Sequence, residues 1–224
     1  MILLSDPAVA AIGAGENGEE LVDARGLLRV DERAAEPSGR FALLRSGVVE
    51  RLLKAQAALP GGLQLLMIEG YRPYDAQLAI FTGYRDQLRG RYPDWSDERV
   101  HVETTKFVSP VEVAPHSTGG AVDLTLCDSG GHEIDMGTPV DATPDDSNNA
   151  CFTAAVNISP EAARNRRILS DALTSAGLIN YPTEWWHWSY GERYWALMTG
   201  KSTTLYGPIR LQDEHRPRTA PAPP

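Results

Sequence analysis

The chain has 224 residues, of which 42% are hydrophobic and 23% are charged, and its formal net charge at pH 7 is −9. This composition is typical of one large globular domain, and the acidic balance argues against nucleic acid or an anionic membrane as the main partner. No apolar stretch reaches the roughly 18 residues that cross a bilayer, and the N-terminus lacks the basic region of a secretory signal. We therefore expect a cytoplasmic protein whose two cysteines, Cys127 and Cys151, are free thiols.

The first third of the chain predicts one helix and one buried strand after an irregular start. Residues 1–40 contain short apolar runs separated by Gly, Asp and Pro, which is typical of loops with one or two short strands. Apolar residues at intervals of three and four predict a helix over 45–59, which ends at Pro60-Gly61-Gly62. The next run, 63–68, has Gln64 as its single polar residue and predicts a buried strand.

The middle of the chain predicts a second helix and a hairpin. An amphipathic helix is expected over 75–89, followed by a polar loop over 90–100 with a short helical turn that begins at Ser96-Asp97-Glu98. Residues 121–126 read as a strand, and the turn signal after it predicts a returning strand over 132–137.

A third helix is predicted from its start signals. Ser159 is a suitable N-cap, Pro160 suits the first helical position, and Gly177 ends the apolar pattern. Helices lie early and late with strands between them, which predicts an α+β fold with a central, mainly antiparallel sheet flanked by helices. We expect a single domain over residues 1–207 and a Pro-rich C-terminal tail over 208–224.

The stretch from Pro115 to Leu126 holds a histidine and an aspartate, and imidazole together with carboxylate suits zinc. His116 and Asp123 are separated by an odd number of positions, so on one regular strand they would face opposite ways. The Gly119-Gly120 pair predicts a turn or bulge that lets the two side chains converge. From position 121 onward apolar residues alternate with Asp123, so its side chain should face a cleft and not the core.

A third ligand must come from elsewhere, and residues 183–188 are the candidate segment because Glu184 precedes His187 by three positions there. Three protein ligands would leave zinc an open position for water, as in catalytic sites, and zinc lowers the pKa of that water toward about 7. Glu184 is placed to accept the proton and pass it to a leaving amine. Arg72, directly after the buried strand, is the candidate for stabilising the oxyanion.

Each of these residues also has a structural interpretation. A histidine among small residues more often forms a structural hydrogen bond, and an aspartate after a glycine-rich turn often belongs to the turn. Arg72 could instead form an ion pair with Asp75 or Glu69. The three tryptophans within residues 183–188 are explained by packing. Three other histidines compete for the ligand role: His101, His132 and His215.

The motifs, taken in this order, resemble the zinc D-Ala-D-Ala peptidases, and in particular the D-alanyl-D-alanine dipeptidases of the vancomycin-resistance type. The metal pattern is His116-x6-Asp123 followed by Glu184-x-x-His187. The stretches that resemble the dipeptidase branch are Glu69-Gly70-Tyr71-Arg72-Pro73, Asp135-Met136-Gly137-Thr138-Pro139, Asn165-Arg166-Arg167 and Tyr181-Pro182-Thr183-Glu184-Trp185-Trp186-His187. The likeness covers residues 20–207.

The resemblance implies a function and a role for each site residue. His116, Asp123 and His187 would bind one Zn²⁺ per chain, Glu184 would be the catalytic base and acid, and Arg72 would stabilise the transition state. The implied reaction is hydrolysis of the small-molecule substrate D-Ala-D-Ala to two D-alanines. The implied fold is the small α+β fold shared with hedgehog signalling domains.

Substrate recognition and two alternative functions complete the expectations. Asp141 lies where the family has an acidic residue near the substrate and is a candidate substrate contact. Ala114-Pro115 replaces the serines of some members, which argues against side-chain binding of the dipeptide's carboxylate there. A preference for dipeptides would follow from a small, closed cavity with the 138–150 loop as its lid. The alternatives are a D,D-carboxypeptidase acting on cell-wall precursors and a non-catalytic binding protein with a structural metal; the intact Glu184 argues against the latter.

Overall fold

The structure is a computed structural model that describes residues 1–209 of the chain. Its elements in chain order are α1 (Pro7–Ala10), β1 (Leu21–Asp23), β2 (Arg29–Val30), η1 (Glu32–Ala34), η2 (Arg40–Ala42), β3 (Leu43–Arg45), α2 (Ser46–Ala58), β4 (Leu63–Glu69), α3 (Tyr74–Arg91), α4 (Asp97–Thr105), η3 (Val111–Val113), η4 (His116–Thr118), β5 (Ala121–Asp128), α5 (Pro144–Ser147), α6 (Pro160–Ser175), β6 (Ile179–Asn180), β7 (His187–Ser189) and α7 (Arg193–Met198).

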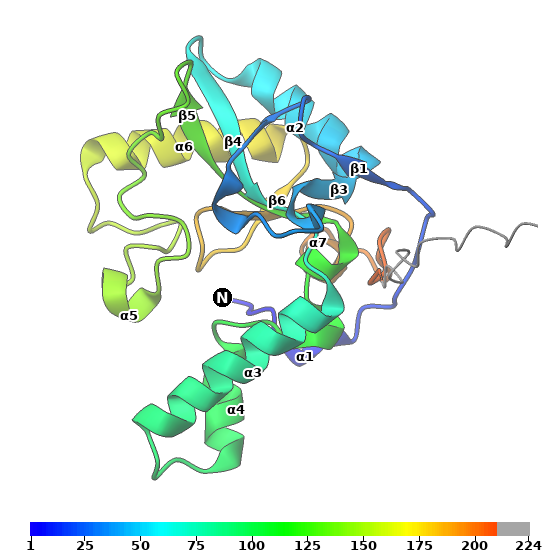
Figure 1. Cartoon of the computed structure of the whole chain (residues 1–224), viewed down its shortest axis with the longest axis vertical. Coiled ribbons are helices and arrows are strands. Elements are labelled where there is room, and N and C mark those ends of the chain that lie inside the picture. The colour runs from blue at the N-terminus through cyan, green and yellow to red at the C-terminus, as the bar shows by residue number, and fades with distance from the viewer. Residues whose placement is uncertain (210–224) are drawn as a thin grey trace, which may run out of the picture.

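A five-stranded sheet with the order β2-β4-β5-β7-β6 forms the centre of the fold (Figure 1). β2 runs parallel to β4, and the other neighbouring strands are antiparallel. β1 and β3 form a separate two-stranded antiparallel sheet. The expected α+β architecture with a mainly antiparallel central sheet is therefore confirmed.

The helices α2 and α6 cover one face of this sheet with apolar side chains. Val48 and Leu52 of α2 and Leu169 and Leu173 of α6 belong to the main buried cluster. The strands contribute alternating residues to the same cluster: Leu65, Met67, Val122, Leu124 and Leu126. Because side chains alternate along a strand, the strand residue Asp123 faces the opposite side of the sheet, where it lines a cavity.

The helices α3 and α4 form a hairpin that projects from the body of the molecule (Figure 1). The sequence predicted α3 but reduced α4 to a short helical turn, and this prediction was wrong. The Ser96 side chain accepts a hydrogen bond from Arg99 N and caps a helix of nine residues. Val100 and Thr104 are buried, so tertiary packing stabilises a helix that its polar sequence alone did not indicate.

The predicted returning strand over 132–137 is also absent from the described part of the chain. Only a single bridge joins Cys127 to Glu133, supported by a hydrogen bond from Ile134 N to the Leu126 carbonyl. Asp135 then accepts a hydrogen bond from Gly137 N and turns the chain away. The segment therefore leaves the sheet and becomes the start of the loop that borders the cavity.

Two further predicted helices and the predicted state of the cysteines agree with the structure. The helices predicted over 45–59 and from Pro160 are present as α2 and α6, and both cysteines are free and buried. Ile209 still contacts the body, since its N donates to the Ser117 carbonyl. Residues 210–224 lie outside the described residues, so the Pro-rich tail stays a prediction. No helix within residues 1–209 is long and apolar enough to cross a membrane.

Candidate metal centre and active site

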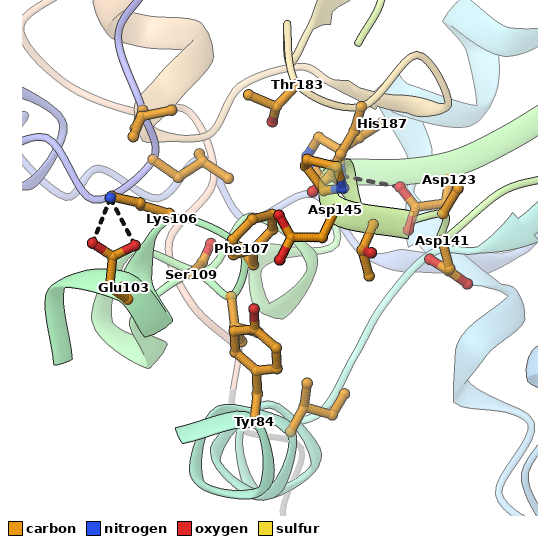
Figure 2. A pocket seen from close by; sticks show the side chains of 18 of the residues that line it. Tyr84, Glu103, Lys106, Phe107, Ser109, Asp123, Asp141, Asp145, Thr183 and His187 are labelled. Atoms are coloured by element: carbon orange, nitrogen blue, oxygen red, sulfur yellow. Dashed lines mark hydrogen bonds and ion pairs between the residues drawn. The ribbon is translucent and has the colours of Figure 1, made fainter. Parts of the chain in front are cut away.

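Three potential metal ligands, His116, Asp123 and His187, meet at the wall of one cavity. Their ligand atoms all lie within 4.8 Å of one another. His187 Nδ1 lies 3.0 Å from Asp123 Oδ1 (Figure 2). It also lies 3.1 Å from His116 Nε2, which is 3.3 Å from Asp123 Oδ2. All three residues are buried. The structure therefore brings His187 together with His116 and Asp123 from a segment more than 60 residues earlier in the chain.

Strand register explains why two of these side chains converge. Asp123 of β5 is paired with His187 of β7 on one side and with Glu69 of β4 on the other. Paired residues in adjacent antiparallel strands point to the same face of the sheet. The pairing of β4 with β5 shifts register between Met67 and Glu69, as in a β-bulge. Because of this shift, Glu69 and not Ile68 stands opposite Asp123.

His116 reaches the same point from a turn. It begins the short 3-10 helix η4, and Gly119 ends that helix with φ 69°, a left-handed conformation that glycine adopts without strain. β5 starts two residues later, at Ala121. The turn that the Gly119-Gly120 pair predicted is therefore present, and it removes the parity difference between His116 and Asp123.

The hydrogen bonding of this cluster fits a bound cation. His116 Nδ1 donates to the Gly70 carbonyl at 2.7 Å, which directs the lone pair of Nε2 toward Asp123 and His187. Although burial alone would raise it, the two histidines hold the pKa of Asp123 well below its usual range. The same carboxylate raises the pKa of His116 against the effect of burial. A metal ion that binds here would displace protons from the histidine side chains. Two imidazoles with one carboxylate are a donor set that zinc accepts.

Glu184 lines the cavity from the loop between β6 and β7. Its Oε2 lies 4.0 Å from His187 Nδ1. Burial, reinforced by the carboxylates of Asp123 and Asp141, raises the pKa of Glu184 to about 7. The loop is held in place by Asn180, whose Nδ2 donates to the backbone carbonyls of Glu184 and His187 at 3.0 Å each. A carboxyl group with this pKa can both accept and donate a proton near neutral pH.

Arg72 lines the cavity directly after β4. Its Nε donates to Glu69 Oε1 at 2.7 Å, its Nη2 donates to Glu69 Oε2, and its Nη1 donates to Gln77 Oε1 at 2.9 Å. The ion pair with Glu69 that the sequence left as an alternative is therefore present. It also raises the pKa of the guanidinium, although burial opposes this. Arg72 has five N–H donors, and the three used here fix its orientation.

Sequence reasoning missed Gln77 as a partner of Arg72, and it did not place Glu69 beside Asp123. Glu69 lies within one of the motifs quoted above, but only the register shift in β4 shows that it is the cross-strand partner of Asp123. Gln77 is a buried polar residue of α3, and its Nε2 donates to the Ser109 carbonyl at 3.0 Å. The sequence signal for Gln77 was its position as a polar residue on the buried side of an amphipathic helix.

The cavity has a volume of about 770 Å³. The 138–150 loop borders it through residues 141–145 and Asn149, as expected of a lid. The volume is larger than the small space that a preference for dipeptides led us to expect. Asp141 lines the cavity and is exposed. Shielding from water by neighbouring protein atoms, followed by the charges of Asp123 and Glu69, raises its pKa to about 6.

Comparison with known proteins decides the family. The sequence profile of the Peptidase_M15 family, described as D-ala-D-ala dipeptidase, matches residues 29–200. The D-alanyl-D-alanine dipeptidase of Synechocystis sp. is 31% identical over 176 residues, which cover 69% of this chain and 71% of that protein. The D-alanyl-D-alanine dipeptidase of Escherichia coli is 31% identical over 147 residues, which cover 65% of each chain.

The chain belongs to the D-Ala-D-Ala dipeptidase family of M15 peptidases. It is therefore a hydrolase, and the resemblance stated from the sequence is confirmed. A solved structure of VanYB in complex with D-Alanine-D-Alanine matches with a TM-score of 0.50 at 15% identity, covering 88% of this chain and 94% of that one. This likeness confirms the fold.

The described histidines that competed with His187 for the role of metal ligand, His101 and His132, lie outside the site. His101 and His132 are exposed, and His132 pairs with Asp128. His215 lies outside the described residues. The tryptophans of the segment 183–188 are buried in the main core cluster, so packing explains them, although Trp186 also contributes to the cavity wall.

Arg166 of α6 organises the loop that carries Asp141. It is buried and donates to three backbone carbonyls: Met136, Ala150 and Phe152, at 2.7 to 2.8 Å. Burial lowers its pKa to about 10, so it stays charged at neutral pH. The Asn165-Arg166-Arg167 motif therefore acts through the backbone of the cavity loop, a role that the sequence did not predict.

Proposed function

We propose that this chain hydrolyses D-Ala-D-Ala to two D-alanines in a zinc-dependent reaction. The observation that carries the proposal is the placement of His116, Asp123, His187, Glu184 and Arg72 around one cavity in a chain of this family. The curated relatives named D-alanyl-D-alanine dipeptidase support the substrate.

His116, Asp123 and His187 would hold the metal ion. Two imidazoles and a carboxylate leave an open coordination position, as catalytic zinc sites require. When bound, zinc supplies Lewis acidity that polarises the peptide carbonyl and activates water. The protein contributes the orientation of the donors, because the Gly70 carbonyl holds His116 and the β5–β7 register holds the other two.

Glu184 would transfer the proton. It would accept a proton from the attacking water and donate it to the amine that leaves as D-alanine. Its raised pKa of about 7 suits both halves of this exchange, and Asn180 limits the movement of the loop that carries it.

Arg72 and Asp141 would act on the substrate. The guanidinium of Arg72 would stabilise the negative charge that develops on the attacked carbonyl oxygen. Its bidentate contact with Glu69 would keep it oriented while two N–H groups remain for the substrate. Asp141 would attract the free ammonium group of the dipeptide through its carboxylate.

Two measurements on purified protein test the proposal. Metal analysis should find one zinc per chain, and the zinc-loaded protein should hydrolyse D-Ala-D-Ala faster than L-Ala-L-Ala. Glu184→Ala should retain zinc and lose at least about 100-fold in kcat, in line with the loss of a general base. Activity that survived this substitution would remove Glu184 from its role, and a zinc-loaded wild type without turnover would support the non-catalytic alternative.

A D,D-carboxypeptidase activity is the alternative that the cavity volume favours. A volume of about 770 Å³ exceeds the needs of two alanines. Competition between D-Ala-D-Ala and a pentapeptide ending in the same two residues distinguishes the two activities. A higher kcat/KM for the pentapeptide would overturn the dipeptidase assignment. The cytoplasmic location expected from the sequence stays a prediction.

A further inference from the structure

The turn that presents His116 is held by hydrogen bonds from three other parts of the chain. Each of the four consecutive backbone carbonyls of residues 116–119 accepts a bond from outside the turn. The donors, in that order, are Arg72 N at 3.2 Å, Ile209 N at 2.8 Å, Arg45 Nε at 2.9 Å and Arg45 N at 2.9 Å. Arg45 therefore supplies two of the four bonds, one from its side chain and one from its backbone.

Arg45, the last residue of β3, is itself fixed on every side. It is buried, and all five N–H donors of its guanidinium have acceptors. Besides the bond from Nε to the turn, Nη1 donates to Glu16 Oε1 at 2.9 Å and to the Glu19 carbonyl, and Nη2 donates to Glu16 Oε2 at 2.7 Å and to the Gly207 carbonyl at 3.3 Å. The side chain cannot move without breaking several of these bonds, so its contact with the turn is rigid.

Glu16 balances the buried charge of Arg45. Its two carboxylate oxygens face the two Nη groups in a bidentate pair. Although partial burial alone would raise it, the hydrogen bonds from Gly18 N and Arg45 lower the pKa of Glu16, so the carboxylate is ionised at neutral pH. A buried guanidinium without such a partner would be strongly destabilising.

The pair of Arg45 and Glu16 lies behind the metal centre. Neither residue is among the described residues that line the cavity, so the pair acts on the site through the turn. The arginine also packs against that turn, since a Cβ on Gly119 would lie 3.4 Å from Arg45 Cγ. The bond from His116 Nδ1 to the Gly70 carbonyl orients the imidazole ring, whereas Arg45 fixes the backbone that carries it.

We propose that Arg45 is a positioning residue for the metal ligand His116. By holding the carbonyls of Thr118 and Gly119, it keeps His116 Nε2 at the point where the other two ligand side chains meet. The Glu16 carboxylate holds Arg45 in turn. The inference rests on the zinc site of the proposed function and is independent of the substrate. It assigns part of the affinity for zinc to a charge pair outside the cavity.

Arg45→Lys tests the contact with the turn. Lysine keeps the positive charge, but its ammonium group lacks the planar fork that reaches Glu16 and the Thr118 carbonyl together. Zinc affinity, measured by competition with a chelator, should fall by about tenfold, the lower end of the range for partners that orient metal ligands. The visible absorption of the Co²⁺-loaded variant should differ from that of the Co²⁺-loaded wild type, because the ligand geometry changes.

Glu16→Gln is the second test variant. It keeps Arg45 and removes its charge partner, so zinc affinity should fall in the same direction by a smaller factor than in Arg45→Lys. The side chain of Glu16 is 46% exposed, and its replacement by an amide of the same size should leave the protein folded. If Arg45→Lys does not fold, Glu16→Gln decides: lower zinc affinity supports the inference, and unchanged affinity overturns it.

Arg166→Lys is the matched control. Arg166 is also a buried arginine that donates to three backbone carbonyls, but these belong to the cavity loop and not to the turn at His116. This variant should melt at a lower temperature than the wild type and keep its zinc affinity and its Co²⁺ absorption. The comparison therefore separates the positioning of a metal ligand from a general loss of stability.

The outcomes also separate this inference from the proposed function. Wild-type zinc affinity and Co²⁺ absorption in folded Arg45→Lys would overturn the inference, because Arg45 would then serve stability alone. Equal losses of zinc affinity in Arg45→Lys and Arg166→Lys would overturn it as well. None of these measurements uses a peptide, so a wild type that binds zinc without hydrolysing D-Ala-D-Ala would overturn the proposed function and leave the role of Arg45 standing.

Discussion

Asp123 and His187 are cross-strand partners, and Asp123 Oδ1 lies 3.0 Å from His187 Nδ1. Asparagine in place of Asp123 keeps the size of the side chain and removes its charge. We expect Asp123→Asn to weaken zinc binding by at least about 100-fold, since even partners outside the ligand set contribute 10–100-fold. Competition with a chelator measures this. Asp128→Asn, at the far end of the same strand, is the control, and equal zinc affinity in both variants would contradict the ligand assignment.

Glu69 holds the proposed oxyanion-stabilising arginine through two hydrogen bonds to Arg72. Glu69→Gln keeps one acceptor and removes the charge, so the guanidinium should lose its fixed orientation. We expect kcat for D-Ala-D-Ala to fall by roughly 10- to 100-fold, less than the roughly 100- to 1,000-fold for complete loss of an oxyanion donor, while the zinc content stays at one per chain. Steady-state kinetics with metal analysis check this. A rise in KM alone would mean that the pair serves binding and not the transition state.

The same pair offers a double-mutant test. Arg72→Lys keeps the charge but cannot form the planar fork that matches a carboxylate. If Glu69 acts through Arg72, the double variant Glu69→Gln with Arg72→Lys should be little worse than the more severe single variant. Additive losses in kcat would show that the two residues act independently.

Asp141 gives a pH-dependent prediction. Shielding by protein atoms and the nearby Asp123 and Glu69 raise its pKa to about 6. Binding of the substrate ammonium needs the ionised form, so KM for D-Ala-D-Ala should rise as the pH falls through about 6. Asp141→Asn should raise KM above that pH and remove this limb of the profile. A limb that persists in the variant would assign it to another group.

Melting temperature separates this binding effect from a folding defect. A carboxyl group whose pKa is raised by folding binds its proton more tightly in the native state, so its ionised form opposes folding above about pH 6. Asp141→Asn removes that charge. The variant should therefore melt no lower than the wild type at pH 7.5, as differential scanning calorimetry can show.

Gly120 is a position where a single methyl group should disturb the metal centre. A Cβ there would lie 2.7 Å from the Tyr190 carbonyl oxygen, which belongs to the backbone and cannot move freely. We expect Gly120→Ala to lower the free energy of unfolding by roughly 1–3 kcal/mol and to weaken zinc binding, because the turn after His116 shifts. Gly61→Ala, which meets nothing within 4 Å, is the control in urea unfolding. Equal stability of both variants would contradict the tight approach.

The sequence indicated the residues that meet at the cavity more fully than the scaffold around them. His116, Asp123, Glu184 and His187 stand in a recognisable order, and the helices α2 and α6 follow from apolar periodicity. The helix α4 was missed because its sequence is polar and its stability comes from packing against α3. The ion pair of Arg72 with Glu69 was one of the alternatives from the sequence, but the position of Glu69 opposite Asp123 was missed because it depends on a register shift in β4, which no local pattern reveals.

Residues that act through the backbone were the hardest to predict. Arg166 contacts three backbone carbonyl groups. Because every residue has a backbone carbonyl group, the residue types in the sequence do not show which ones Arg166 binds. The cavity volume is likewise set by how far the α3–α4 hairpin stands from the sheet, which is a tertiary property. Sequence patterns identify reactive groups because their chemistry needs particular side chains; they do not specify the space between elements.

The anchoring of the cavity loop by Arg166 has a consequence for how this scaffold can change. Its contacts lie at Met136 on one side of the loop and at Ala150 and Phe152 on the other, so both ends are fixed to α6 while the intervening residues around Asp141 line the cavity. We expect substitutions at exposed positions of that span, such as Asp141, to change the lining of the cavity with little effect on folding, unlike substitutions of the buried Val140. The loop therefore offers a region in which new substrate preferences can arise, by natural variation or by design, without rebuilding the metal centre.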